Sequence, residues 1–143
     1  GSDFMFIGRG YNLATAFEGA LKMKEISYLH AEGYGAGEMK HGPLALVDRK
    51  MTVVGIAPEG RVTEKMVSNM QEIKARRGNL IAVVTKGMKL PLADVLIEIP
   101  SCPEMFSPIL GVIPMQLLAY HTAVGLNKDV DQPRNLAKSV TVE

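Results

Sequence analysis

Apolar residues form four short runs along the chain, each bounded by glycine, proline or polar residues. The runs occupy residues 4–7, 51–57, 79–85 and 94–99. Near-continuous apolar runs of this length are typical of strands that are buried on both faces of a sheet. We therefore predict four strands, and we expect a parallel sheet because helical segments alternate with the strands.

Two segments between these runs carry helical spacing. Residues 12 to about 30 contain one glycine and no proline, and Asn12 is the expected N-cap. The predicted apolar arc of this helix comprises Leu13, Phe17, Ala20, Leu21 and Tyr28. Residues 63–77 repeat the helical spacing and are followed by Gly78, a residue that favours helix ends.

A third helix is predicted over residues 107–125. Ser107 and Pro108 form a favoured start, and Gly125 marks the end. A hydropathy scan flags residues 105–124, yet this stretch holds polar residues that lipid would leave poorly satisfied. We interpret it as a buried core helix and predict no membrane association.

Glycine density marks residues 33–43 as an irregular segment. Four glycines and Pro43 fall within it, which is a density that neither a helix nor a strand favours. We predict a shaped loop here. With the strands and helices above, the fold class is α/β: a three-layer αβα sandwich with a parallel, doubly wound sheet, whose ligands sit beyond the carboxyl ends of the strands.

Composition narrows the functional classes. A chain of 143 residues, 47% of them hydrophobic, suits one compact domain. The formal charge of +1 gives no electrostatic reason to expect nucleic acid or an anionic membrane as a partner. The single cysteine, Cys102, allows no internal disulfide and has no metal-ligand spacing around it, which favours a reducing, cytoplasmic compartment and no metal.

Gly8, Arg9 and Gly10 follow the first predicted strand, as a phosphate-binding turn would. The third glycine of a dinucleotide-binding fingerprint would fall at Leu13, which is not glycine. Turn geometry is therefore a better interpretation than nucleotide binding, and we predict no cofactor.

Four side chains are candidates for chemistry. Glu18, Lys22 and Glu25 are spaced so that they fall within roughly 60° of one another on the first helix. They form either a solvated face with an ordinary ion pair or a functional carboxylate beside an ammonium. His41 stands next to a Gly-Pro corner, where it is either a positioned proton carrier or an ordinary loop histidine.

Residues 127–143 mix charged and apolar side chains, and we expect this tail to dock rather than to remain disordered. Lys138 in the tail has two interpretations. It is a solvated charge, or it is an amine whose pKa is lowered when the docked tail removes it from water, which would allow it to act as a nucleophile.

Two long segments resemble the glucosamine-6-phosphate synthase family, also called glutamine–fructose-6-phosphate aminotransferase. They are ALKMKEISYLHAEGYGAGEMKHGPLALVD at residues 20–48 and DVDQPRNLAKSVTVE at residues 129–143. The resemblance implies a SIS-type, flavodoxin-like sugar isomerase domain over residues 1–126, with residues 127–143 as a tail that closes the sugar site. It implies the conversion of fructose 6-phosphate and glutamine-derived ammonia to glucosamine 6-phosphate, in a cytoplasmic homodimer.

The resemblance also implies roles for individual residues. Glu25 matches the base that moves a proton between C1 and C2, and Lys22 matches the residue that assists at the substrate hydroxyl. His41 matches an acid/base for ring opening that comes from the neighbouring subunit. Glu18 matches a residue that supports the Lys22 and Glu25 pair.

The tail carries the remaining roles that the resemblance implies. Lys138 matches the lysine that forms a Schiff base with the open-chain sugar. Ala137 is a substrate-contacting neighbour, and Arg134 is expected to hold the tail in place.

Two parts of the family's machinery are missing from these residues. The Ser/Thr-rich phosphate loop belongs to a sister SIS domain, and the nucleophilic cysteine belongs to a glutaminase domain. We therefore expect this chain alone to be inactive. The alternative is a non-catalytic SIS module that senses sugar phosphates in a regulator.

Overall fold

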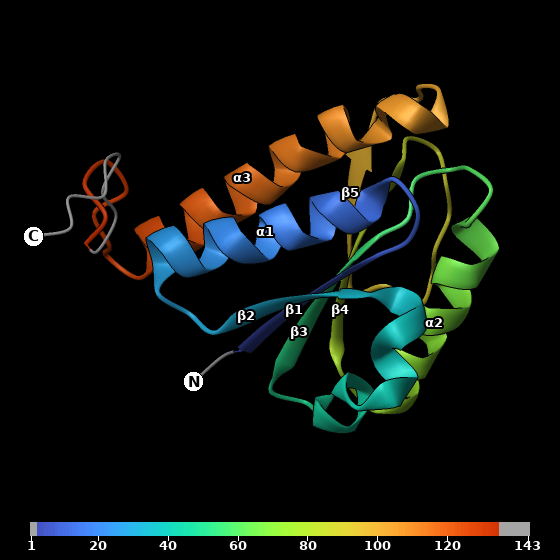
Figure 1. Cartoon of the computed structure of the whole chain (residues 1–143), viewed down its shortest axis with the longest axis horizontal. Helices are drawn as coiled ribbons and strands as arrows, with labels where there is room; N and C mark the ends of the chain where they lie inside the picture. Colours follow the sequence, from blue (N-terminus) through green and yellow to red (C-terminus); the bar gives the residue numbers. More distant parts are fainter. Residues whose placement is uncertain (1–2, 135–143) are drawn as a thin grey trace, which may run out of the picture.

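A five-stranded parallel sheet forms the centre of the chain (Figure 1). The structure is a computed structural model that describes residues 3–134. Its strands are β1 (Asp3–Gly8), β2 (Ala31–Gly35), β3 (Met51–Ile56), β4 (Asn79–Thr85) and β5 (Val95–Ile99). The spatial order is β2-β1-β3-β4-β5, so the strand order reverses between β1 and β3, as in doubly wound folds.

Helices cover both faces of this sheet. The helices are α1 (Asn12–Ser27), α2 (Thr63–Ala75) and α3 (Ser107–Gly125), with short 3₁₀ segments η1 (Ala36–His41), η2 (Pro43–Leu46) and η3 (Glu104–Phe106). Helices α1 and α3 lie side by side on one face, while α2 lies on the other face with η1 and η2 (Figure 1). The predicted three-layer αβα fold is confirmed.

The alternation of side chains along β1 supplies both layers with core residues. Met5 and Ile7 are buried in the layer that contains α2, and Phe6 between them is buried against α1 and α3. Successive side chains of a strand point to opposite faces, so one strand serves two cores. Each core is formed around fully buried apolar residues, which explains the near-continuous apolar runs of the sequence.

The predicted loop over residues 33–43 is wrong for its first part, because residues 31–35 form the edge strand β2. The close approach of α1 explains why this strand contains a glycine at position 33. A Cβ atom at Gly33 would lie 2.7 Å from Cδ1 of Phe17 and 3.0 Å from its Cα. The glycine lets α1 pass close over β2, a reason that only the packed structure reveals.

The predicted apolar arc of α1 is also wrong in part. Phe17 and Leu21 are 50% and 42% exposed. The buried face consists mainly of small residues, namely Asn12, Thr15, Ala16, Gly19, Ala20, Met23 and Ser27. Small side chains allow α1 to approach the sheet closely, so the larger apolar residues lie on the flank. The helix ends at Ser27 rather than near residue 30.

Asn12 does not cap α1, contrary to the sequence prediction. It lies inside the helix and is buried, and Tyr11 holds the N-cap position without a side-chain hydrogen bond. The Asn12 Nδ2 group donates to Ser107 Oγ at 2.9 Å, and its Oδ1 accepts from Thr15 Oγ1 at 3.0 Å. A buried amide needs such partners, and here they tie the start of α1 to the start of α3.

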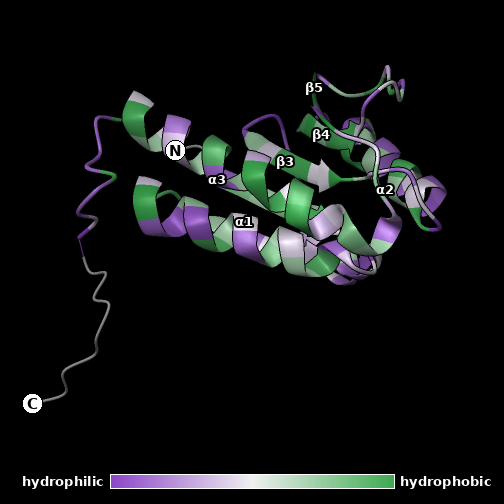
Figure 2. Ribbon diagram, turned by 90° about the horizontal axis from the view of Figure 1, so that it is seen from above, coloured by the Kyte–Doolittle hydropathy of each residue, from purple (hydrophilic) through white to green (hydrophobic). Residues whose placement is uncertain are grey.

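Helix α3 is not the fully buried core helix that the sequence predicted. Its buried residues recur mainly at every fourth position, as Ser107, Gly111, Met115, Ala119 and Ala123. Its outer side exposes Ile109, Ile113, Leu117, Tyr120 and Val124. Figure 2 shows the apolar colouring along this helix. Among the described residues, 104–125 form one helix that is long and apolar enough to cross a membrane, a test that core helices also meet.

We predict that Gly19→Ala destabilises the fold. The added Cβ atom would lie 2.7 Å from Cδ1 of Phe6 and 2.9 Å from Sδ of Met115, and both side chains are fully buried. Overpacking costs about 1–3 kcal/mol, which outweighs the gain of about 1 kcal/mol in helix propensity. Urea unfolding should show the loss.

The matched control is Gly125→Ala, at the last residue of α3. An added Cβ atom meets no atom within 4 Å there. Its free energy of unfolding should stay unchanged or rise slightly. Equal effects of the two substitutions would contradict the close packing of α1 against Phe6.

Candidate functional site

Three charged side chains meet on the outer face of α1. Lys22 Nζ donates a hydrogen bond to Glu25 Oε2 at 2.7 Å and lies 3.5 Å from Glu18 Oε1. At about 100° per residue, these positions lie on average roughly a third of a turn away from the centre of the buried face of the helix. The sequence prediction that the three side chains share one face is confirmed.

The cluster is partly shielded from water. The side chains of Glu18, Lys22 and Glu25 are 38%, 31% and 23% exposed. The hydrogen bond to Glu25 raises the pKa of Lys22, aided by the charges of Glu25 and Glu18 and opposed by partial burial. Lys22 therefore stays an ammonium at neutral pH, which makes it a hydrogen-bond donor and a poor nucleophile.

The chain returns to α1 after α3 ends. The backbone N–H of Arg134 donates to Tyr28 Oη at 2.8 Å, and the Arg134 guanidinium lies 4.4 Å from the centre of the Tyr28 ring. Lys128 Nζ lies 5.4 Å from the same ring. Lys138 and Ala137 lie outside the described residues. Arg134, within the tail, is thus placed about one turn of α1 beyond Glu25.

The contact between Tyr28 and Arg134 was not predicted from the sequence. Tyr28 was counted with the apolar arc of the helix, although it is the C-cap of α1 and has left-handed backbone angles. No local pattern marks a tyrosine as the partner of residues about one hundred positions later, because the contact depends on where α3 ends.

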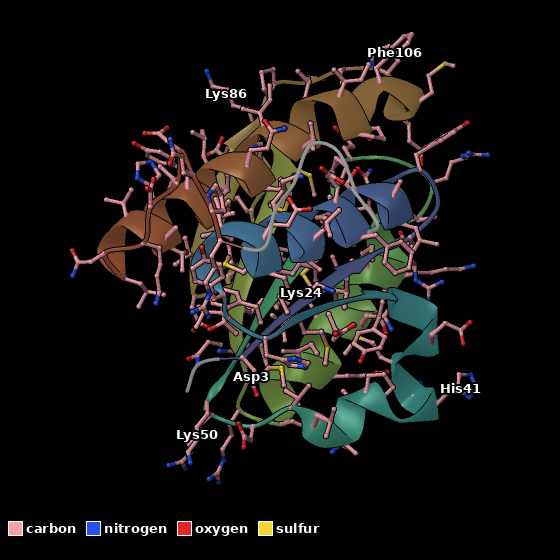
Figure 3. All side chains as sticks on the ribbon, turned by 60° about the vertical axis from the view of Figure 1, so that its left-hand side comes forward. Asp3, Lys24, His41, Lys50, Lys86 and Phe106 are labelled. Carbon is pink, nitrogen blue, oxygen red and sulfur yellow. The ribbon has the colours of Figure 1, made fainter. Side chains whose placement is uncertain are left out.

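His41 does not lie with the other candidates. It is exposed at the end of η1, which follows the carboxyl end of β2, and Figure 3 shows it far from Lys24 of α1. Helix α1 starts after the carboxyl end of β1 and runs back along the sheet, so Glu25 lies toward the amino ends of the strands. The cluster on α1 is therefore not at the carboxyl ends, where the sequence analysis expected ligands.

The Gly-Arg-Gly turn at those carboxyl ends shapes the start of α1. The backbone N–H of Asn12 donates to the Arg9 carbonyl, and that of Leu13 donates to the Gly10 carbonyl. Gly10 has a φ of 57°, a value that favours glycine. These bonds favour the turn interpretation over nucleotide binding.

A polar cleft of about 240 Å³ lies beside this turn, between α2 and η1. Its lining includes Arg9, Lys40, Lys65 and Glu72. Arg9 Nε donates to Asn69 Oδ1 at 3.0 Å, and Lys40 pairs with Glu72 at 3.1 Å. Within the described part of the chain, no group of three His, Cys, Asp or Glu residues could hold a metal ion.

Comparison with protein families matches the SIS domain to residues 3–125. Curated relatives carry the name glutamine–fructose-6-phosphate aminotransferase (isomerizing). One from Bacteroides thetaiotaomicron is 59% identical over 143 residues, covering 99% of this chain and 23% of the relative. One from Thermus thermophilus is 57% identical, covering 99% of this chain and 24% of the relative. The chain thus spans about a quarter of the length of these relatives.

Solved structures share the fold. The C-terminal domain of glucosamine-fructose-6-phosphate aminotransferase from Francisella tularensis superposes with a TM-score of 0.85 at 44% identity, covering 92% of this chain and 38% of that one. A glucosamine-6-phosphate deaminase from Thermotoga maritima gives a TM-score of 0.79 at 26% identity, covering 99% and 41%.

We predict that Glu25→Gln lowers the pKa of Lys22 toward its ordinary value. The hydrogen bond to Glu25 is the largest cause of the raised pKa, whereas Glu18 contributes less at its longer distance. NMR titration of the Lys22 side chain should therefore show a larger drop in Glu25→Gln than in Glu18→Gln. Equal drops would contradict the dominant role of Glu25.

Proposed function

The chain belongs to the SIS domain family, and from that membership we propose that it is the second sugar isomerase domain of an enzyme that makes glucosamine 6-phosphate. The proposed substrates are fructose 6-phosphate and ammonia released from glutamine. The observation that carries the proposal is the 57–59% identity to isomerizing aminotransferases over 99% of the chain. Because the chain spans about a quarter of those relatives, the glutaminase and the sister SIS domain belong to the rest of the parent protein.

Glu25 acts as the base that carries a proton between C1 and C2 of the sugar. Oε2 of Glu25 accepts a hydrogen bond from Lys22, and Oε1 has no partner among residues 3–134, which leaves it free to take a proton. Lys22 keeps its charge and donates a hydrogen bond at the substrate hydroxyl. Glu18 supports this arrangement because its carboxylate helps to hold the Lys22 ammonium.

Lys138 forms the Schiff base with the open-chain sugar. This step needs a neutral amine, and the raised pKa of Lys22 makes that lysine unsuitable for it. Residues 127–143 therefore act as a tail that closes the sugar site formed on residues 1–126. Arg134 holds the tail, and Ala137 contacts the sugar beside Lys138.

His41 serves the site of a second subunit. Within one chain His41 is exposed beyond the carboxyl end of β2, whereas Glu25 lies toward the amino ends of the strands, so we infer that the two residues of one subunit do not act on the same sugar. A homodimer that brings His41 of one subunit to Glu25 of the other completes the acid/base set for ring opening. We expect this dimer in the cytoplasm.

The alternative function is a non-catalytic sugar-phosphate sensor in a regulator. Such a module needs neither a base nor a Schiff-base lysine. The curated relatives reported above are named as isomerizing aminotransferases, and their similarity extends over 99% of this chain. This similarity does not favour the sensor. The chain by itself is expected to be inactive, because the phosphate loop and the glutaminase lie elsewhere.

We predict that Glu25→Gln in the full-length protein reduces glucosamine 6-phosphate synthesis at least about a hundredfold, since general base catalysis contributes that much. Glutamine hydrolysis should remain largely intact because Glu25 acts only on the sugar. The matched control is Glu32→Gln, which removes an exposed carboxylate at 4.0 Å from Lys24. Parallel loss of both activities in Glu25→Gln would count against the role of Glu25 as a base.

Mixing two inactive variants tests the shared site. Full-length His41→Ala and Glu25→Gln proteins should regain activity when they exchange subunits, because one of the two sites in a hybrid dimer has both wild-type residues. Random exchange gives hybrids in about half of the dimers, so about a quarter of the wild-type activity is expected. Mass spectrometry should first demonstrate that the subunits have exchanged. If activity does not recover after that exchange, the site is not shared between subunits.

A further inference from the structure

The polar cleft between α2 and η1 lies where doubly wound folds hold ligands. One of its walls is Arg9, the first residue after β1, and the strand order of the sheet reverses between β1 and β3. Ligands of such sheets bind beyond the carboxyl ends of the strands at this reversal. The cluster of Glu18, Lys22 and Glu25 does not line the cleft, so the cleft is a separate candidate site.

Arg9 is held in one orientation at the wall of the cleft. Its Nε donates to Asn69 Oδ1 at 3.0 Å, which is its only side-chain hydrogen bond among residues 3–134. The backbone of η1 closes over the guanidinium, because a Cβ atom on Gly37 would lie 3.2 Å from Nη2 and 3.4 Å from Nη1 of Arg9. No carboxylate of residues 3–134 lies within 4.0 Å of this guanidinium. Arg9 therefore offers a positioned fork of N–H donors with an uncompensated charge.

Asn69 adds a neutral donor whose orientation is also fixed. It is 5% exposed and lines the cleft from α2. A guanidinium can only donate, so the Asn69 atom that faces Arg9 is the amide oxygen and the NH₂ group is on the other side. That NH₂ group has no hydrogen-bond partner among residues 3–134 and keeps contact with solvent. A buried amide with such a donor at the wall of a cleft is suited to bind a ligand.

The remaining lining gives the cleft a net positive charge. The lining residues of α2 are spaced at i, i+3, i+4 and i+7 and so share one face of the helix, namely Lys65, Ser68, Asn69 and Glu72. Lys40 pairs with Glu72 at 3.1 Å, whereas no carboxylate of the described chain lies within 4.0 Å of Lys65. Arg9 and Lys65 thus leave two positive charges without partners. A phosphate monoester carries about −1.5 to −2 charge at neutral pH and three acceptor oxygens, which match this set of donors.

We propose that this cleft binds the phosphate group of a small phosphate monoester, at a site separate from the charged cluster on α1. The fork of Arg9 and the amide of Asn69 bind the phosphate oxygens, and Lys65 balances the second charge. The cleft volume of about 240 Å³ is below the roughly 300–1,000 Å³ of pockets that enclose drug-sized ligands, so the rest of the ligand stays outside. The inference does not depend on the proposed function.

Protection of individual lysines from acetylation tests this site in the full-length protein. The protein is acetylated with and without glycerol 3-phosphate, and the modification of each lysine is measured by mass spectrometry. Lys65 should be protected, whereas Lys50, an exposed lysine before β3, should not be. Acetate at equal ionic strength should protect neither lysine. Equal modification of Lys65 with and without glycerol 3-phosphate would overturn the site, and equal protection by acetate would overturn its assignment to phosphate.

Inorganic phosphate separates the ester from the free ion. Because the rest of an ester lies outside the cleft, glycerol 3-phosphate should protect Lys65 at least as well as inorganic phosphate does. Much stronger protection by inorganic phosphate would show that the cleft binds the free ion and would contradict a monoester as the ligand.

Two variants test how Arg9 binds. Arg9→Gln should raise the half-protecting concentration of glycerol 3-phosphate at least about tenfold, because charge-assisted hydrogen bonds are lost. Gly37→Ala keeps every charge but displaces the Arg9 fork, so it should raise that concentration about threefold at an unchanged unfolding temperature. The matched control is Arg49→Gln, an exposed arginine outside the cleft, which should behave as the wild type. Wild-type protection in both Arg9→Gln and Gly37→Ala would overturn the proposal.

Discussion

The close approach of α1 to the sheet and to α3 is the constraint on which the site depends. Gly19 leaves no room for a Cβ atom between Phe6 and Met115, and Ala16 and Ala20 continue the same small-residue face. Interiors pack at crystal-like density, so a helix seated this closely has one rotational setting. That setting turns Glu18, Lys22 and Glu25 to the outside, and it brings the end of α1 to the place where the chain leaves α3.

The electrostatics of the cluster separate the roles of two lysines. Lys22 lies between two carboxylates, which raise its pKa and keep it charged. A lysine that forms a Schiff base needs the opposite environment, with little nearby negative charge and little water. In the proposed enzyme these requirements are met by different parts of the chain: helix α1 holds the charged donor, and the C-terminal segment carries the proposed nucleophile, Lys138.

Tyr28 links helix α1 to that segment. Tyr28 lies about one turn beyond Glu25 and has a left-handed backbone. Its hydroxyl and its ring both contact Arg134. His41 is at the end of η1, which follows the carboxyl end of β2, whereas Glu25 lies toward the amino ends of the strands; the proposed chemistry therefore uses a second subunit.

The sequence by itself determined the fold class, four of the five strands and the common face of Glu18, Lys22 and Glu25, because apolar runs and helical periodicity are local properties. Only the tertiary structure decided which apolar residues are buried. Strand β2 was not predicted because it contains Gly33, a glycine that leaves room for the nearby Phe17. The buried face of α1 consists mainly of small residues and does not include Phe17 and Leu21. The partners of Asn12 and Tyr28 lie about a hundred residues away, at Ser107 and Arg134. Such contacts depend on how whole helices pack, and no pattern within either segment encodes them.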